Sequence, residues 1–211
     1  MRACSSGAPH QIPDMTIPPR LVVGISGASG VILGIRLLTT LRRLGVESHL
    51  VVSRSAEVTL AHETGMKVAE LRALADVCYP AQDIGAAISS GSFRTMGMVV
   101  APCSIRTMSE IATGVTSTLL TRAADVTLKE RRRLVLMVRE TPLHLGHLRT
   151  MTALAEMGAV IAPPVPAFYA RPRTIDDLVD HSVGRVLDLF GIDTGTLNRW
   201  GEPDTPETIE I

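Results

Sequence analysis

A short apolar run that ends abruptly in small residues is the feature that most constrains the fold of this chain. Residues 21–25 read Leu-Val-Val-Gly-Ile, residues 26–30 read Ser-Gly-Ala-Ser-Gly, and an amphipathic helical pattern covers residues 31–44. A strand, a turn of small residues and a helix, in this order, place backbone N–H groups where they can surround a phosphate. The stretch therefore predicts a phosphate-binding turn at the start of an α/β sheet. The alternative is a tight strand–helix turn that binds nothing.

The rest of the chain continues the alternation of strands and helices. Further strands are expected at 48–52, 96–101, 134–138 and 159–162. Helices are expected at 56–62, 71–75, from 105 onward, and at 119–131, 144–157 and from 174 onward. Short buried strands that alternate with helices are typical of a mostly parallel, doubly wound sheet. The sequence therefore predicts a three-layer α/β fold.

Length and composition limit the number of domains and the class of partner. The 211 residues suit one domain, which we expect over 20–202, between a disordered leader at 1–19 and a loose tail at 203–211. Met15 is an alternative start of the chain. Lys plus Arg equals Asp plus Glu, at 21 each, and aromatic residues are only 3%. This balance argues against nucleic acid or an anionic membrane as the partner.

Three cysteines without metal-ligand spacing favour a protein of the reducing cytoplasm that needs neither disulfides nor a metal. Cys103 directly follows an expected strand, and we interpret it as a small buried residue in preference to a nucleophile.

Polar side chains follow four of the expected strands. They lie at 26–29, at Ser53, at 103–107 and at 139–140. Because the carboxyl ends of parallel strands meet at one edge of a sheet, we expect these four clusters to converge there.

The spacing of the glycines favours FMN over a dinucleotide. Gly24, Gly27, Gly30 and Gly34 do not follow the Gly-x-Gly-x-x-Gly pattern. The second strand is followed by Ser53 and an arginine, where a dinucleotide site needs an acidic residue for the ribose. A hydroxyl and a cation suit a phosphate, so a mononucleotide is the expected ligand.

Seven short motifs then occur in order along the chain. They are Gly-Ile-Ser-Gly-Ala-Ser-Gly at 24–30, Ser-Ser-Gly-Ser-Phe at 89–93, Pro-Cys-Ser at 102–104, Thr-Arg-Ala-Ala-Asp at 121–125, Leu-Lys-Glu-Arg at 128–131, Val-Arg-Glu-Thr-Pro-Leu at 138–143 and Pro-Ala-Phe-Tyr at 166–169. Together they resemble the flavin prenyltransferases of the UbiX/Pad1 family, over about residues 21–202.

The resemblance implies a fold, a reaction and partners. The fold is flavodoxin-like (Rossmann-like). The reaction transfers a dimethylallyl group from dimethylallyl monophosphate to N5 and C6 of reduced FMN, without a metal. The product, prenylated FMN, serves a UbiD-type decarboxylase. The family assembles as a dodecamer with its sites between subunits.

The resemblance also implies site residues. The flavin contacts are Gly27, Ala28, Ser29, Ser53, Ser104, Ile105, Arg106, Thr107 and Arg139. The catalytic residues are Glu63, Lys129, Glu140 and the interface residue Arg122, and Glu63 is expected to reach the site from a neighbouring subunit. The dimethylallyl phosphate contacts are Lys129, Tyr169 and Arg185.

Several of these residues have a structural alternative. Ser53 can be a helix N-cap, and Lys129 begins a charge run that can be a solvated face. Arg139 and Glu140 can form a structural ion pair. Many relatives carry Lys where Arg106 stands.

Other features are interpreted as structural. His144 and His147 lack a third metal ligand in view, so packing on a helix face is favoured. Trp200 is expected to anchor the C-terminal segment. The run 116–121 departs from the Thr-Asp-Gly of many relatives.

Two other functions remain as alternatives. One is a flavin-binding carrier or subunit of a non-oxidative aromatic acid decarboxylase system. The other is an FMN-dependent oxidative decarboxylase of cysteinyl substrates. That family has a Pro-x-Met-Asn loop, whereas the loop at 102–104 here reads Pro-Cys-Ser.

Overall fold

A six-stranded parallel sheet organises the part of the chain that the computed structural model describes, which is residues 19–195, 197, 199 and 201. The strand order is β3-β2-β1-β4-β5-β6, and every pairing is parallel. The strands are β1 (Arg20–Ile25), β2 (Glu47–Val52), β3 (Val77–Tyr79), β4 (Gly97–Cys103), β5 (Arg133–Val138) and β6 (Val160–Ile161).

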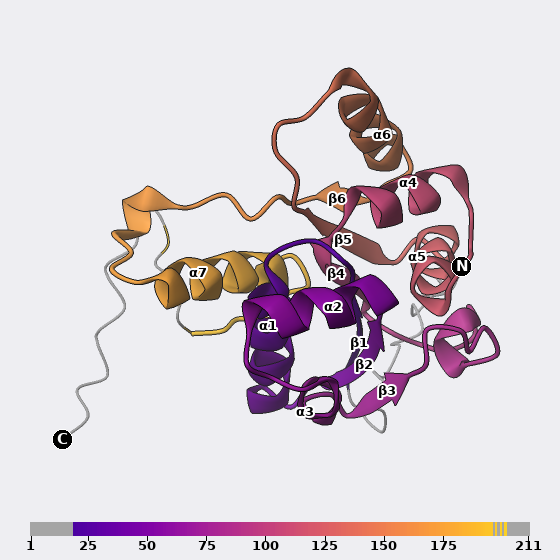
Figure 1. Cartoon of the computed structure of the whole chain (residues 1–211), viewed down its shortest axis with the longest axis horizontal. Coiled ribbons are helices and arrows are strands. Elements are labelled where there is room, and N and C mark those ends of the chain that lie inside the picture. The colour runs from indigo at the N-terminus through magenta and orange to yellow at the C-terminus, as the bar shows by residue number, and fades with distance from the viewer. Residues whose placement is uncertain (1–18, 196, 198, 200, 202–211) are drawn as a thin grey trace, which may run out of the picture.

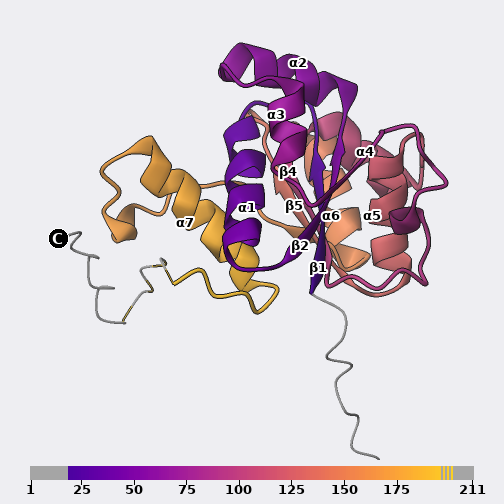
Figure 2. The same ribbon diagram turned by 90° about the horizontal axis from the view of Figure 1, so that it is seen from below.

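Helices cover both faces of this sheet. The helices are α1 (Val31–Arg43), α2 (Arg54–Glu63), α3 (Val68–Ala73), α4 (Ile105–Thr113), α5 (Leu119–Lys129), α6 (Leu145–Glu156) and α7 (Ile175–Asp188), with short 3-10 turns η1 (Ala87–Ser89) and η2 (Phe168–Ala170). One hydrophobic core joins the sheet to α1, α2, α3 and α7, and a second joins it to α4, α5 and α6. Figure 2 shows the sheet on edge between α1 and α7 on one side and α4 and α5 on the other. The predicted three-layer, flavodoxin-like α/β fold is confirmed.

Burial on both faces of the sheet explains why the strand sequences are nearly continuous apolar runs. In β1, Leu21, Val23 and Ile25 belong to the first core, whereas Val22 belongs to the second. Successive side chains of a strand point to opposite faces, and here both faces are covered. All seven residues of β4 are buried for the same reason.

Most expected elements are shifted by one to three residues at their ends, such as the helix expected at 71–75, which is α3 at 68–73, and two of the differences have a visible cause. Strand β3 was not expected, because it has only three half-buried residues at the edge of the sheet. The helix expected to reach residue 131 ends at Lys129, and Arg131 adopts a left-handed backbone with φ of 55°.

The topology predicts a ligand-binding crevice at the carboxyl ends of the strands. Strand β1 pairs with β2 on one side and with β4 on the other, so successive strands are added outward in one direction up to β3 and in the opposite direction from β4 onward. In doubly wound sheets, ligands bind beyond the carboxyl ends of the strands at this switch point. Figure 1 shows α2 and the loop before α1 above this region.

Some expectations fall outside the described residues. They concern the leader up to residue 18, Trp200, and residues 202–211. Within the described residues, none of the helices has the length and apolar character needed to span a bilayer.

Candidate active site

The loops after β1 and β4 are joined by Ser26, whose side chain is fully buried. Its hydroxyl donates to the carbonyl of Pro102 at 2.9 Å and accepts the backbone N–H of Ser104 at 2.7 Å. The backbone N–H of Ser26 donates to the same carbonyl at 3.2 Å. A buried hydroxyl with all of its hydrogen bonds satisfied holds both loops in one position.

The loops after β2 and β5 join the same edge. The backbone N–H of Ser53 donates to the carbonyl of Ile25 at 2.9 Å, and that of Arg139 donates to the carbonyl of Cys103 at 3.0 Å. Four strand-end loops are therefore linked in the order β2, β1, β4, β5. The predicted convergence of the polar clusters is confirmed.

Two of the predicted flavin contacts are helix N-caps. The Ser53 hydroxyl accepts the N–H of Ala56 at 3.1 Å at the start of α2. The Ser104 hydroxyl accepts the N–H of Thr107 at 3.3 Å at the start of α4 and donates to its hydroxyl at 3.1 Å. The positive ends of both helices therefore face the crevice, and capping is compatible with anion binding there.

The turn after β1 packs closely on α2. A Cβ atom added to Gly27 would lie 2.2 Å from Cβ of Ser55, so only glycine fits. Ala28 is buried, whereas Ser29 is exposed. This close approach holds the turn before α1 against the first turn of α2.

Glu63 occupies the N-terminal end of α1. Its carboxylate accepts the N–H of Gly30 at 2.8 Å and that of Val31 at 3.0 Å. Burial acts to raise the pKa of Glu63, but hydrogen bonds from Ser29, Gly30 and Val31 and the nearby charge of Arg139 outweigh it and hold this pKa below its usual value. Glu63 is thus ionised at neutral pH and contacts the loop of its own chain, and its approach from a neighbouring subunit stays a prediction.

Arg139 and Glu140 are exposed at the end of β5. One carboxylate oxygen of Glu140 accepts the N–H of Thr141 at 3.0 Å. Between 19 and 195 neither side chain forms an ion pair within 4.0 Å, so the alternative of a structural ion pair is wrong. Their charges point into solvent at the crevice.

The segment at the start of α4 is divided between buried and exposed residues. Thr107 is buried and Ile105 is half-buried. Arg106 is exposed and pairs with Glu110 at 2.9 Å. In this arrangement its guanidinium is held along α4 by a neighbour one turn away.

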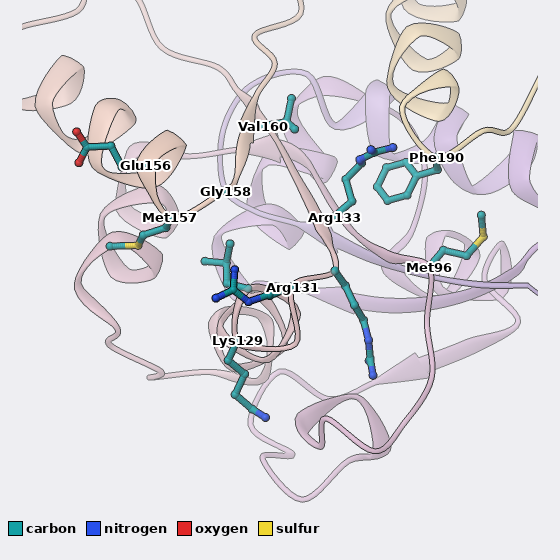
Figure 3. Close-up of a pocket in the computed structure, with 11 residues that line it drawn as sticks. Met96, Lys129, Arg131, Arg133, Glu156, Met157, Gly158, Val160 and Phe190 are labelled. Carbon is teal, nitrogen blue, oxygen red and sulfur yellow. The ribbon is translucent and has the colours of Figure 1, made fainter. Parts of the chain in front are cut away.

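Lys129 lies at the opposite side of the sheet, near the amino-terminal ends of the strands. It ends α5, immediately before β5 begins, and it pairs with Glu130 at 2.5 Å. It lines an open cavity of about 950 Å³ together with the arginines that follow it, Met96 and Phe190. Figure 3 shows Lys129 projecting from the end of α5 and Arg133 beside the ring of Phe190. Within a single copy of the chain, Lys129 and the pair Arg139 and Glu140 therefore lie at opposite ends of the strands.

The other predicted phosphate contacts lie on separate helices. Arg122 pairs with Asp125 at 2.8 Å along α5. On α7, Arg185 pairs with Asp188 at 2.6 Å, and Tyr169 of η2 contacts His181. The single chain thus presents the predicted residues in separate places: the strand-end crevice, the first turn of α5, the C-terminal end of α5, and the surface of α7 beside η2.

Sequence reasoning missed two residues that organise these groups. Arg132 holds the loop at 91–93 through two backbone carbonyls, and His181 contacts Tyr169. Arg132 lies inside a charge run that reads as solvated. The only signal for His181 was its place one helical turn before Arg185.

The two histidines at 144 and 147 lie at the start of α6, where His144 is the N-cap and not a residue of the helix face. Nδ1 of His144 accepts the N–H groups of Gly146 and His147 and so caps α6, and the two imidazole rings stack at 3.5 Å. Across the described part of the chain, no three His, Cys, Asp or Glu side chains gather in a way that suits a metal ion.

Comparisons with known proteins agree with this constellation. A family model described as Flavoprotein matches residues 11–187. The flavin prenyltransferase UbiX of Escherichia coli strain K12 is 63% identical over 174 residues, which is 82% of this chain and 92% of that protein.

Two solved structures share the fold at high identity. A crystal structure of AnUbiX (PadA1) with FMN and dimethylallyl pyrophosphate superposes with a TM-score of 0.87 at 52% identity, over 89% of this chain and all of that one. A dodecameric FMN-dependent UbiX-like decarboxylase from Escherichia coli O157:H7 gives a TM-score of 0.84 at 49% identity, over 87% and 100%. With this identity over most of its length, the chain belongs to the UbiX family of flavin prenyltransferases.

Proposed function

We propose that this chain transfers the dimethylallyl group of dimethylallyl monophosphate to N5 and C6 of reduced FMN, and that a UbiD-type decarboxylase receives the prenylated FMN. The observation that carries the proposal is the crevice where four strand-end loops meet beside the exposed Arg139 and Glu140. The enzyme works in the cytoplasm as a homo-oligomer, in which we expect twelve subunits as in the dodecameric relative. Family membership and the match to a structure with FMN support this proposal.

The donors at the crevice fit the phosphate of FMN. The N–H groups of Gly30 and Val31 donate to the carboxylate of Glu63, so their geometry suits an anionic oxygen. The capped N-terminal ends of α2 and α4 add two positive helix ends. Gly27, Ala28, Ser29, Ser53 and the segment 104–107 are the residues that we propose to hold the flavin nucleotide.

The proposed reaction makes two bonds to the flavin. Reduced FMN supplies two nucleophilic positions, N5 and C6. The first bond forms between N5 and the allylic carbon as the carbon–oxygen bond breaks. The electron pair of that bond leaves with inorganic phosphate, and N5 gives up its proton. The second joins C6 to the prenyl double bond, with one proton added to the alkene and one lost from C6.

The charged residues of the chain stabilise the departing phosphate and move protons. We assign charge neutralisation to Lys129, Arg139 and Arg185, with Tyr169 as a further hydrogen-bond donor and Arg122 beside the phosphate. Glu140 and Glu63 exchange protons with the flavin during ring closure. The lowered pKa of Glu63 keeps it ionised, so it begins as a proton acceptor.

Each complete site takes residues from more than one copy of the chain. Lys129 ends a helix at the amino edge of the sheet, whereas Arg139 and Glu140 follow a strand at the carboxyl edge. A dodecameric assembly in a relative supports the juxtaposition of the two edges from different subunits.

The test is anaerobic incubation with reduced FMN and dimethylallyl monophosphate, followed by mass spectrometry of the flavin. We expect prenylated FMN from the wild-type protein, and its absence would overturn the proposal. Glu140→Gln is expected to bind FMN normally and to lower turnover by about 10²-fold or more, because it removes a proton-transfer group. Glu70→Gln is the matched control at an exposed site on α3, away from the cavity that Lys129 lines, and should keep full turnover.

The Glu140→Gln variant also distinguishes a transferase from the flavin-binding carrier named as an alternative. A carrier has no turnover to lose, so Glu140→Gln would deliver cofactor to a decarboxylase as well as the wild-type chain does. A parallel incubation with dimethylallyl pyrophosphate tests the choice of the monophosphate.

A further inference from the structure

The corner between η2 and α7 contains a hydrogen bond that the proposed reaction does not use. The hydroxyl oxygen of Tyr169 lies 3.1 Å from Nε2 of His181. The two rings meet edge to face, with centroids 5.6 Å apart and an interplanar angle of 84°. Figure 1 shows the connection from β6 running out to η2 and turning back into α7. Tyr169 of η2 thus contacts the second turn of α7.

His181 and Arg185 lie on the same face of α7, because they are four residues apart on a regular helix. Arg185 is held by Asp188 at 2.6 Å, and Asp188 is also bonded by both terminal nitrogens of Arg199. A phenol, an imidazole and a guanidinium therefore line one surface of α7.

The acidic residues in the first turns of α7 have other partners. Asp176 and Asp180 pair with Arg36 of α1. Asp177, one turn before His181 on the same face, accepts the N–H groups of Arg173 and Thr174. Among the described residues, the charge that acts on the imidazole is that of Arg185.

We infer that His181 is a positioning residue for the prenyl phosphate, which orients the phenol of Tyr169 so that its hydrogen is directed to the leaving phosphate. The inference rests on the proposed function, in which Tyr169 and Arg185 contact that phosphate. A phenol has one hydrogen to donate, and the imidazole decides where it goes. When Nε2 carries a proton, it donates to the phenol oxygen and leaves the phenol hydrogen for the phosphate. When Nε2 is bare, it takes that hydrogen itself.

The protonation of His181 gives a readout that a purely structural role would lack. Burial and the charge of Arg185 both lower the pKa of His181, so the imidazole is neutral at pH 7. Acidification through this pKa protonates both nitrogens, forces Nε2 to donate and adds a cation beside Arg185. All of these changes favour a bound phosphate. The ratio of kcat/KM for the wild-type chain to kcat/KM for a variant that does not titrate at position 181 should therefore rise as the pH falls.

The experiment measures kcat and KM for dimethylallyl monophosphate from pH 5 to pH 8, with FMN saturating. His181→Phe keeps a ring but removes the hydrogen bond, and His181→Gln keeps a donor but does not titrate. We expect His181→Phe to lower kcat/KM about three- to tenfold and His181→Gln to restore part of it. In a Tyr169→Phe background, His181→Phe should have less than a twofold further effect, because the partner is already absent. The dissociation constant of FMN should stay unchanged.

The inference is overturned if His181→Phe keeps kcat/KM within twofold, if the two substitutions act additively, or if the ratio of wild type to His181→Gln does not vary with pH. Comparing chains at the same pH cancels the ionisation of the substrate itself. Failure of the proposed function is distinguishable, because the wild-type chain would then make no prenylated FMN at any pH.

Discussion

Cys103 shows how burial decides the chemistry open to a single residue. It ends β4 with no exposed surface, beside the loop that carries Ser104. Burial raises the pKa of its thiol to about 12. The reactive form of cysteine is the thiolate, so this thiol is inert at neutral pH despite its place beside the crevice. From its sequence position, a nucleophile was the less favoured alternative, and the buried thiol agrees with the preferred interpretation.

We predict that Cys103 resists alkylation in the native protein. Iodoacetamide at pH 8 should leave it essentially unmodified, whereas the half-buried Cys78 should react slowly. Peptide mass mapping after native labelling, and again after unfolding in denaturant, measures both sites. Rapid native labelling of Cys103 would contradict the burial seen here.

At the scale of elements, Arg132 joins the end of α5 to the loop that follows η1. Its two terminal nitrogens donate to the carbonyls of Gly91 and Phe93, each at 2.6 Å. The ring of Phe93 is in turn packed by the guanidinium of Arg20 at 4.9 Å and by His49 at 5.1 Å. The loop is thus fixed from both sides, and it lies against Lys129, whose ammonium would be 2.8 Å from a Cβ at Gly91.

We predict that Arg132→Ala loosens this loop. Loss of two hydrogen bonds from a charged group should cost about 2 kcal/mol and lower Tm by about 4–8 °C. Amide hydrogen exchange should accelerate over residues 89–93. Arg131→Ala is the control, since Arg131 lines the same cavity and its side chain hydrogen-bonds to none of the other described residues. Equal acceleration in both variants would show that the two hydrogen bonds of Arg132 do not hold the loop.

At the scale of the whole molecule, two segments expose apolar side chains. Leu145 on α6 is 60% exposed, and Phe168 and Ile175 near the corner of η2 and α7 are 76% and 78% exposed. In α6 itself only Leu154 is buried. Apolar surface of this kind marks contacts with other protein surfaces, in keeping with the homo-oligomer that we propose.

We predict that two inactive variants complement each other. Lys129→Ala and Glu140→Gln alter opposite edges of the sheet, so a mixed assembly contains some sites with both residues intact. Random mixing restores about a quarter of the sites if one edge comes from each of two copies. Co-expression and measurement of prenyl transfer test this.

The control is a mixture of Arg139→Ala and Glu140→Gln. Both substitutions lie at the carboxyl end of β5, so the two variants should not complement each other. Recovery in both mixtures, or in neither, would show that the two edges do not combine between copies.

Much of the architecture follows from local patterns. Buried strands and amphipathic helices have short periods that local sequence reveals, and the small residues after β1 mark the turn before α1. The edge strand β3 escaped prediction, because three half-buried residues carry too little pattern. Likewise, a charge run does not show that Arg132 turns inward, since its partners are carbonyls about 40 residues earlier.

The order of apolar and small residues was enough for the fold class and for predicting a ligand site at the carboxyl ends of the strands, because these depend on backbone direction and local steric demands. The preference for a mononucleotide also needed the hydroxyl and the cation that follow β2. The family motifs added the reaction and the candidate residues. Tertiary structure decided which residues meet: it placed Glu63 on the N-terminal end of α1, separated Lys129 from Glu140, and joined Tyr169 to His181. Such contacts depend on how distant segments pack, and no local period encodes that packing.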